Sequence, residues 1–296
     1  MASRVISEIS RGLRRTFSRP KEPKKHVAVV VPWSNREIFT SDEKVSLRHL
    51  FHYLQGHEKY LLVPSGSGIV VPGFQVVQVP RRYFGSASNH DRLLYKAWFY
   101  KKFSRFEFIL FYHLDSLVIS HDILKWCSLD FDYIGAPWIK CDDSPWVDVP
   151  RVGNGGLSML RVDRAISVLA NRARMDPHSI IFQWFGEFCP SWFVHIFRVF
   201  RCRVRVVDRL LDEWEQSQCP TNYGRGNDHF WSDRAVNYLH EFRVASLEEG
   251  LQFGFEVSPR TCFEMAGRKM PFGCHAWGKY DREFWRPFLL TDGKPN

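Results

Sequence analysis

The chain has 296 residues, of which 45% are hydrophobic and 16% aromatic, so it is long and apolar enough for a globular core and is not a disordered chain. No stretch has the length and apolar character of a transmembrane helix, and no continuous apolar run follows the first charges as in a signal peptide. The formal net charge of +9 fits a nucleic acid, an anionic membrane surface or a phosphorylated small molecule equally well.

Most of this charge lies in the first 25 residues, where eight Lys or Arg residues stand against two Glu. Five apolar residues there are spaced as on one face of a helix: Val5, Ile6, Ile9, Leu13 and Phe17. The pattern is typical of a basic amphipathic helix on a bilayer surface, and it also fits a solvated tail. We therefore expect a basic N-terminal arm over residues 1–25 and no nucleic-acid partner for the remaining, only mildly basic chain.

Seven cysteines are scattered through the chain without any Cys-x-x-Cys pair, which favours reduced thiols over a zinc site or a redox pair. The localisation that we expect is cytoplasmic, with peripheral contact on the cytosolic face of a membrane through residues 1–25 as an option.

Strands and helices alternate in the part of the chain that follows the arm. Apolar runs predict strands at 26–31, 60–63, 74–79 and 106–119, and helical spacing of apolar residues predicts helices at 43–54 and 91–103. Alternation of this kind is typical of an α/β fold with a parallel sheet connected by right-handed crossovers.

The second half of the chain is less regular. The sequence predicts short elements at 123–127 and 133–134, a glycine-rich turn entering a strand at 153–160, and helices at 163–173 and 228–239. One continuous domain over residues 26–290, followed by a tail at 291–296, fits this pattern better than two domains.

The apolar run at 106–119 carries one acid, Asp115, toward its carboxyl end. An ionised acid that is buried without a partner costs free energy, so Asp115 either faces solvent at the mouth of the strand or pairs with a cation. Ligands of open α/β sheets bind at such strand mouths. A turn or helix-cap role for Asp115 is the alternative.

Four short segments combine residue types that carry chemistry: His-Leu-Asp-Ser at 113–116, Gly-Asn-Gly-Gly at 153–156, Gly-Asn-Asp-His-Phe-Trp at 226–231 and Pro-Phe-Gly-Cys-His-Ala-Trp at 271–277. A single Asp, a glycine turn or a lone His is weak by itself. Together with Phe-Gly-Ser at 84–86 and Phe-Asp-Tyr-Ile-Gly-Ala-Pro-Trp at 131–138, they resemble a domain-of-unknown-function family whose members are expected to be GT-A-type glycosyltransferases.

The resemblance implies a GT-A-like, Rossmann-like single domain with a mainly parallel central sheet flanked by helices. It implies a UDP-sugar or another nucleotide-sugar as donor and a divalent metal, Mn²⁺ or Mg²⁺, at the donor diphosphate. Asp115 and His275 correspond to the metal ligands, although the usual Asp-x-Asp is incomplete. The further donor contacts that it implies are Val31, Pro32, Trp33, Arg92, Lys96, His113, Ser116 and Lys279.

The resemblance also implies a catalytic base. Asp228 corresponds to the carboxylate that deprotonates the acceptor hydroxyl in inverting enzymes, although the family usually has Glu-Asp where this chain has Asn227 and Asp228. Capping of the following helix is the structural alternative for Asp228. Contacts with the donor sugar or the acceptor are expected from Gly153, Asn154, Gly155, Gly156, Trp138, Asn227, Trp231 and Trp277.

We therefore expect a metal-dependent, inverting glycosyltransferase that moves a hexosyl or pentosyl group from a UDP-sugar to a hydroxyl of an oligosaccharide or glycan acceptor. The alternative is a sugar-binding or nucleotide-binding scaffold that keeps the fold without turnover, which the incomplete Asp-x-Asp and Asn227 favour.

Overall fold

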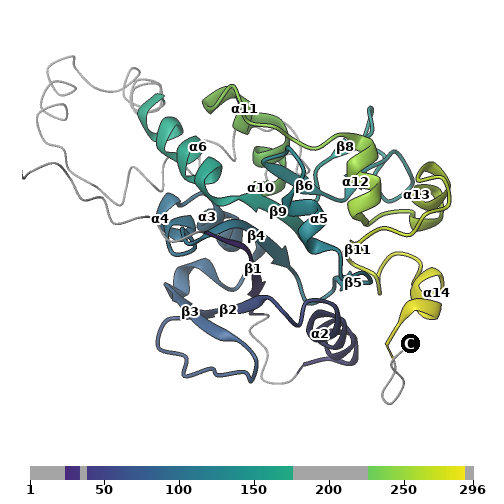
Figure 1. Cartoon of the computed structure of the whole chain (residues 1–296), viewed down its shortest axis with the longest axis horizontal. Helices are drawn as coiled ribbons and strands as arrows, with labels where there is room; N and C mark the ends of the chain where they lie inside the picture. The colour runs from purple at the N-terminus through teal and green to yellow at the C-terminus, as the bar shows by residue number, and fades with distance from the viewer. Residues whose placement is uncertain (1–23, 34–38, 176–225, 291–296) are drawn as a thin grey trace, which may run out of the picture.

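A six-stranded sheet forms the centre of the computed structural model, which describes residues 24–33, 39–175 and 226–290 (Figure 1). Its strands follow the order β3 (Gln75–Val79), β2 (Glu58–Pro64), β1 (Lys25–Pro32), β4 (Phe106–Tyr112), β9 (Leu157–Arg161) and β6 (Tyr133–Gly135). Each neighbouring pair from β3 to β4 is parallel, and β9 is antiparallel to both of its neighbours. The fold is therefore mixed α/β with a mainly parallel sheet, as predicted.

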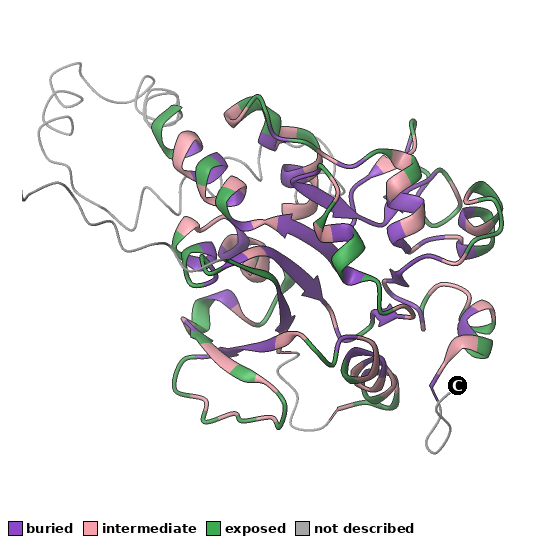
Figure 2. Cartoon of the chain, in the orientation of Figure 1, coloured by how far each residue is buried: buried purple, intermediate pink, exposed green. Residues whose placement is uncertain are grey.

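The two central strands are continuous apolar runs because they are covered on both faces. Val29, Val30 and Val31 of β1 and Ile109 of β4 are 0% exposed. Edge strand β3 instead exposes Gln75 and Gln78 and half-buries the residues between them. Figure 2 shows this contrast, with a buried sheet and helices that turn exposed sides outward.

Helices pack against the sheet along its length. The first helix, α2 (Ser41–Tyr53), begins at a capping box in which the Thr40 side chain and Glu43 bond each other's backbone N–H. Helix α4 packs against α6, α6 lies against β4 and β9, and α5 lies against β1. The bounds of these and the preceding helices are α3 (Ala87–Leu94), α4 (Ala97–Lys101), α5 (Ile123–Cys127), α6 (Val162–Met175) and the 3₁₀ turn η1 (Arg81–Tyr83).

Two small sheets and a second apolar core complete the fold. One sheet has the order β10 (Gly254–Phe255), β11 (Gly273–Cys274) and β5 (Leu117–Val118), and the other pairs β7 (Pro137–Trp138) with β8 (Arg151–Val152). Trp277 and Trp285 are buried in this core. The helices around it are α12 (Leu247–Phe253), α13 (Pro259–Met265), α14 (Arg282–Trp285) and the 3₁₀ turn η4 (Arg286–Phe288).

Three predicted elements are divided in the structure. The helix predicted at 91–103 is α3 and α4, because Lys96 between them has an extended backbone (φ −105°, ψ 112°). The helix predicted at 228–239 is α10 (Asn227–His229), the π-helical turn η3 (Phe230–Arg234) and α11 (Ala235–Tyr238). The strand predicted at 106–119 is β4 and β5, which belong to different sheets.

Some predictions fall on residues that lie outside the described part of the chain. These are the helix expected within the basic arm, up to residue 23, and the tail at 291–296. Among the helices that the structure describes, none is long and apolar enough to cross a bilayer.

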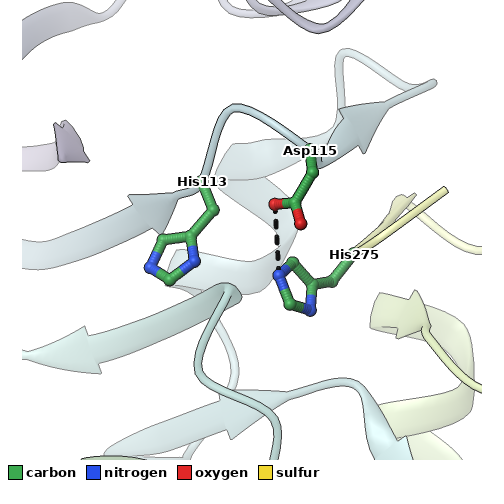
Figure 3. A group of neighbouring side chains, drawn as sticks. All are labelled: His113, Asp115 and His275. Carbon is green, nitrogen blue, oxygen red and sulfur yellow. Dashed lines mark ion pairs between the residues drawn. The ribbon is translucent and has the colours of Figure 1, made fainter. Parts of the chain in front are cut away.

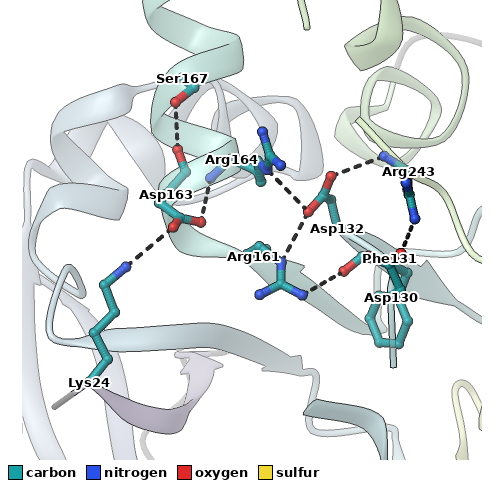
Figure 4. A network of polar contacts seen from close by, with 9 residues as sticks. All are labelled: Lys24, Asp130, Phe131, Asp132, Arg161, Asp163, Arg164, Ser167 and Arg243. Carbon is teal, nitrogen blue, oxygen red and sulfur yellow. Dashed lines mark hydrogen bonds and ion pairs between the residues drawn. The ribbon is translucent and has the colours of Figure 1, made fainter. Parts of the chain in front are cut away.

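A buried aspartate ties the far edge of the sheet to the C-terminal part of the chain (Figure 4). Asp132, whose side chain is 7% exposed, accepts a hydrogen bond from Arg161 Nε at 3.0 Å and from the backbone N–H of Arg243 at 3.0 Å. Arg164 Nε lies 3.6 Å away. Asp132 therefore joins the start of β6, the end of β9 and the segment at Arg243.

We predict that Asp132→Ala lowers the free energy of unfolding by about 3 kcal/mol, because it leaves the guanidinium and the backbone N–H without their buried acceptor. Asp130→Ala is the matched control, since Asp130 also pairs with Arg243 but its side chain is 82% exposed, and we expect less than about 1 kcal/mol. Urea unfolding measures both. Equal losses in the two variants would contradict the structural role of Asp132.

Candidate functional site

A cavity of about 830 Å³ opens where β1 and β4 end. The strand order reverses at this point, with β2 and β3 on one side of β1 and β4 on the other, which is where open α/β sheets bind ligands. The end of β1, the starts of α2 and α3 and the turn after β4 line one part of the cavity. The glycine turn before β9, the start of α10 and one residue after β11 line the rest. The lining residues are Pro32, Trp33, Thr40, Asp42, Glu43, Tyr83, Phe84, Gly85, Ser86, Ala87, His90, Asp91, His113, Leu114, Asp115, Asn154, Gly155, Gly156, Gly226, Asn227, Asp228 and His275.

Three side chains in this cavity form a cluster with the composition of a metal site (Figure 3). One ligand atom each from His113, Asp115 and His275 lies within 4.8 Å of the others, and His275 Nε2 is 3.2 Å from Asp115 Oδ1. Two imidazoles and one carboxylate suit a divalent transition metal, whereas Mg²⁺ and Ca²⁺ prefer oxygen ligands throughout. The residues present therefore fit a divalent cation that accepts imidazole.

Glu256 orients the third member of this cluster. Its carboxylate accepts a hydrogen bond from His275 Nδ1 at 2.9 Å, which leaves Nε2 directed at Asp115. A carboxylate behind a histidine ligand fixes the tautomer and the ring position in many metal sites.

The cluster has an asymmetric charge state. Burial, reinforced by the neighbouring His275, lowers the pKa of His113 to about 3, so this imidazole is neutral at pH 7. Partial desolvation would raise the pKa of Asp115, but the hydrogen bond from His275 outweighs it and holds the pKa well below the usual range. Burial alone would lower the pKa of His275, but its bonds to Asp115 and Glu256 raise it to about 10. A metal ion would displace that proton.

The glycine turn is shaped by close approach. A Cβ on Gly156 would lie 2.1 Å from His275 Nε2, and a Cβ on Gly153 would lie 2.2 Å from the Trp138 ring. No glycine of this turn has a positive φ, so backbone conformation is not the reason for glycine here. Glycine is required here because His275 and Trp138 occupy the space of a side chain.

This turn is bonded to the turn that carries Asp115. The carbonyl of Gly156 accepts hydrogen bonds from the His113 backbone N–H at 2.9 Å and from Ser116 Oγ at 3.2 Å. The side chain of Asn154 closes the glycine turn by accepting from the Gly156 N–H at 2.9 Å. Ser116 is buried, and its hydrogen bond holds the turn that carries Asp115 against the glycine turn.

Asp228 lies across the cavity, at the start of α10. Burial raises the pKa of the Asp228 carboxyl, and the nearby charge of Glu256 raises it further. The charge of His229 and the hydrogen bond from the His229 backbone N–H, at 2.9 Å, lower this pKa and offset part of the rise. A carboxylate with a raised pKa accepts a proton more readily near neutral pH. The N-cap position of α10 is held by Gly226, so Asp228 is not the capping residue that we considered as its alternative role.

Several site residues were missed by sequence reasoning. Asp91 accepts a hydrogen bond from Asn227 Nδ2 at 2.6 Å, and burial raises its pKa to about 6. His90 lines the cavity, and its Nε2 has no hydrogen-bond partner in the described part of the chain. Nothing in the local sequence distinguishes Asp91 or Glu256 from surface residues, because their roles come from partners more than 18 positions away.

The structure brings together many of the predicted residues and separates others. Pro32, Trp33, His113, Asp115, Asn154, Gly155, Gly156, Asn227, Asp228 and His275 line the cavity. Val31 is 0% exposed inside β1, and Trp231 and Trp277 are 1% exposed in the two cores, so none of the three offers a surface to a ligand. Arg92, Lys96 and Lys279 are not among the described residues of the lining, and Trp138 lines a neighbouring cavity instead.

The described lining is rich in acids. It holds five carboxylates, those of Asp42, Glu43, Asp91, Asp115 and Asp228, and neither Lys nor Arg. Helices α2 and α3 begin at the cavity, and their N-termini contribute partial positive charge. In the described lining, positive charge therefore comes from His275 and these helix ends and not from Lys or Arg side chains.

The fold is that of a mixed α/β protein, with a cavity at the carboxyl ends of its parallel strands. A family model described as "Protein of unknown function (DUF5672)" matches residues 73–275, and the chain belongs to this family. The expected membership in a family of unknown function is thereby confirmed, and the description assigns no activity.

Comparisons with individual proteins are less close. No curated protein matches the chain. Among solved structures, the chain is similar to a glycosyltransferase involved in the glycosylation of the major capsid of PBCV-1, at 12% identity and a TM-score of 0.40, covering 89% of this chain and 98% of that one.

We predict that Asp91→Asn stabilises the protein at neutral pH. Since burial raises the pKa of Asp91 from 3.8 to about 6, ionising it in the folded state costs free energy as the pH rises through this window. Asn keeps the acceptor for Asn227, so the variant should gain about 2 kcal/mol over the wild type at pH 7.5 and little at pH 4. Urea unfolding at several pH values tests this, and a difference that does not change with pH would contradict it.

Proposed function

We propose that this protein is a metal-dependent glycosyltransferase of the GT-A type that moves a sugar from a nucleoside diphosphate, UDP, to a hydroxyl of a glycan acceptor with inversion. The observation that carries the proposal is the meeting, in one cavity, of the cluster His113, Asp115 and His275 with the half-buried carboxylate of Asp228. The cluster would hold the cation that binds a phosphate-bearing donor, and Asp228 would deprotonate the acceptor.

The acidity of the cavity favours a donor bound through a metal. Among the described lining residues, no Lys or Arg offsets the two phosphates, so His113, Asp115 and His275 would hold the cation that does. When bound, a divalent cation supplies Lewis-acid stabilisation of the departing diphosphate. The two imidazoles favour Mn²⁺ over Mg²⁺. The N-termini of α2 and α3 add weaker positive potential on the same side.

In the proposed reaction, Asp228 takes the proton of the acceptor hydroxyl. The acceptor oxygen forms a bond to the anomeric carbon, the bond between that carbon and the phosphate oxygen breaks, and the nucleoside diphosphate leaves with the electron pair. The raised pKa of Asp228 suits a base. Asn227, in place of a second acid, holds Asp91 by a 2.6 Å hydrogen bond and so fixes the start of α10.

We predict that UDP binding depends on Mn²⁺ and on Asp115. Calorimetric titration of the full chain with UDP should give binding with Mn²⁺, about tenfold weaker binding with Mg²⁺ and none with a chelator, since the imidazoles disfavour Mg²⁺. Asp115→Ala should abolish the metal-dependent part. The exposed Asp122, whose side chain forms no cap hydrogen bond, provides the control variant Asp122→Ala. Metal-independent UDP binding, or none, would refute the proposed donor site.

We predict that Asp228→Asn leaves UDP–Mn²⁺ affinity nearly intact and lowers sugar transfer by about two or more orders of magnitude, because the amide cannot accept the proton. Hydrolysis of a panel of nucleotide-sugars first identifies the donor, and a transfer assay with that donor then compares wild type, Asp228→Asn and the exposed control Asp148→Asn. An active Asp228→Asn variant would remove Asp228 from the mechanism. UDP–Mn²⁺ binding by a wild type that turns over no donor would favour the scaffold alternative.

A further inference from the structure

A second cavity of about 300 Å³ adjoins the first. It shares Asn154, Gly226 and Asp228 with the first cavity, and it is closed by residues that the proposed reaction has not used. These are Trp138, Asp143, Ser144, Trp146, His229, Glu256, Val257 and Tyr280. Asp228 therefore lines two cavities. The first cavity also holds His113, Asp115 and His275, here called the metal-type cluster, and the second does not.

The walls of the second cavity are aromatic. Trp138 stacks on His229 with ring centroids 4.2 Å apart and an angle of 26° between the planes. Trp146 meets both rings, at 5.3 Å and 5.6 Å. The pair Trp138 and His229 is thus held rigidly, while Trp146 and Tyr280 are half-buried and keep part of their surface open. Aromatic surfaces with polar neighbours suit the C–H faces and hydroxyls of a sugar ring.

The charge of the second cavity is one-sided. Its described lining holds three carboxylates, those of Asp143, Asp228 and Glu256, and neither Lys nor Arg. The ammonium of Lys279 lies at the edge of this cavity and donates a hydrogen bond to Tyr280 Oη at 2.6 Å. The charges of Glu256 and Asp143 attract this ammonium. Glu256 is paired with His275 at 2.9 Å, so Asp143 and Asp228 stand against this one cation, and an anionic group placed here would meet net repulsion.

We infer that the second cavity binds the acceptor and that this acceptor is a neutral or amino sugar. Saccharides with carboxylate, phosphate or sulfate groups are rejected chiefly by Asp143. The inference rests on the proposed function, because a sugar seated here lies beside Asp228, which lines both cavities. Asp143 is the residue that sets the charge preference, since it is exposed and free of the duties that bind Glu256 to His275.

The test uses three methyl glycosides that share one ring and differ in charge: methyl glucoside, methyl glucosaminide and methyl glucuronide. Saturation-transfer NMR on the full chain, without donor, measures their dissociation constants. We expect the glucuronide to bind at least tenfold more weakly than the other two, and Trp146→Ala to weaken all three. Asp143→Lys should remove the discrimination against the glucuronide, whereas the neighbouring exposed Asp142, which is outside the lining, should keep it as Asp142→Lys.

Equal binding of the three glycosides by the wild type, binding of none, or an unchanged preference in Asp143→Lys would overturn the inference. UDP–Mn²⁺ titration of the same samples reports on the first cavity alone. Normal UDP–Mn²⁺ binding without a charge preference for glycosides would therefore refute only the acceptor assignment, whereas absent UDP–Mn²⁺ binding would refute the proposed function.

Discussion

The site depends on one junction, where the carbonyl of Gly156 accepts hydrogen bonds from the turn that carries Asp115. The antiparallel pairing of β9 with β4 brings the two turns together, because Leu157 lies opposite Tyr112. The missing Cβ of Gly156 then admits His275 from the small sheet. A single backbone position thus joins the central sheet to the C-terminal core and assembles three ligand atoms from two distant segments.

Part of this architecture could be predicted from the amino-acid sequence. Continuous apolar runs predicted the buried strands β1 and β4, since burial on both faces leaves no alternation. Helix breaks were harder, because no Gly or Pro marks the extended backbone of Lys96 or the π-helical turn after α10. Asp115, Asp228 and His275 were each weak signals alone, and they became candidates through the set of short motifs that resembles a known family.

The rest of the site could not be predicted because it consists of pairings between remote residues. Glu256 differs from any surface glutamate only through its bond to His275, and Asp91 only through its bond to Asn227. Aromatic residues misled for a related reason. Trp231 and Trp277 have the composition of a sugar platform, yet both fill the cores because a large apolar ring gains more from burial than from a half-exposed position.

The two cavities place different electrostatic demands on their ligands, although both are acidic. In the first, His113 and His275 accompany the acids, and in the proposed function a divalent cation held there would reverse the local charge and admit a diphosphate. In the second cavity, no comparable cluster of metal-binding imidazoles lies beside Asp143 in the described lining, so the potential remains negative. Asp228 lies between them, and its raised pKa follows from burial beside the charge of Glu256. A base placed here gains affinity for a proton from the acidity that would keep an anionic acceptor out.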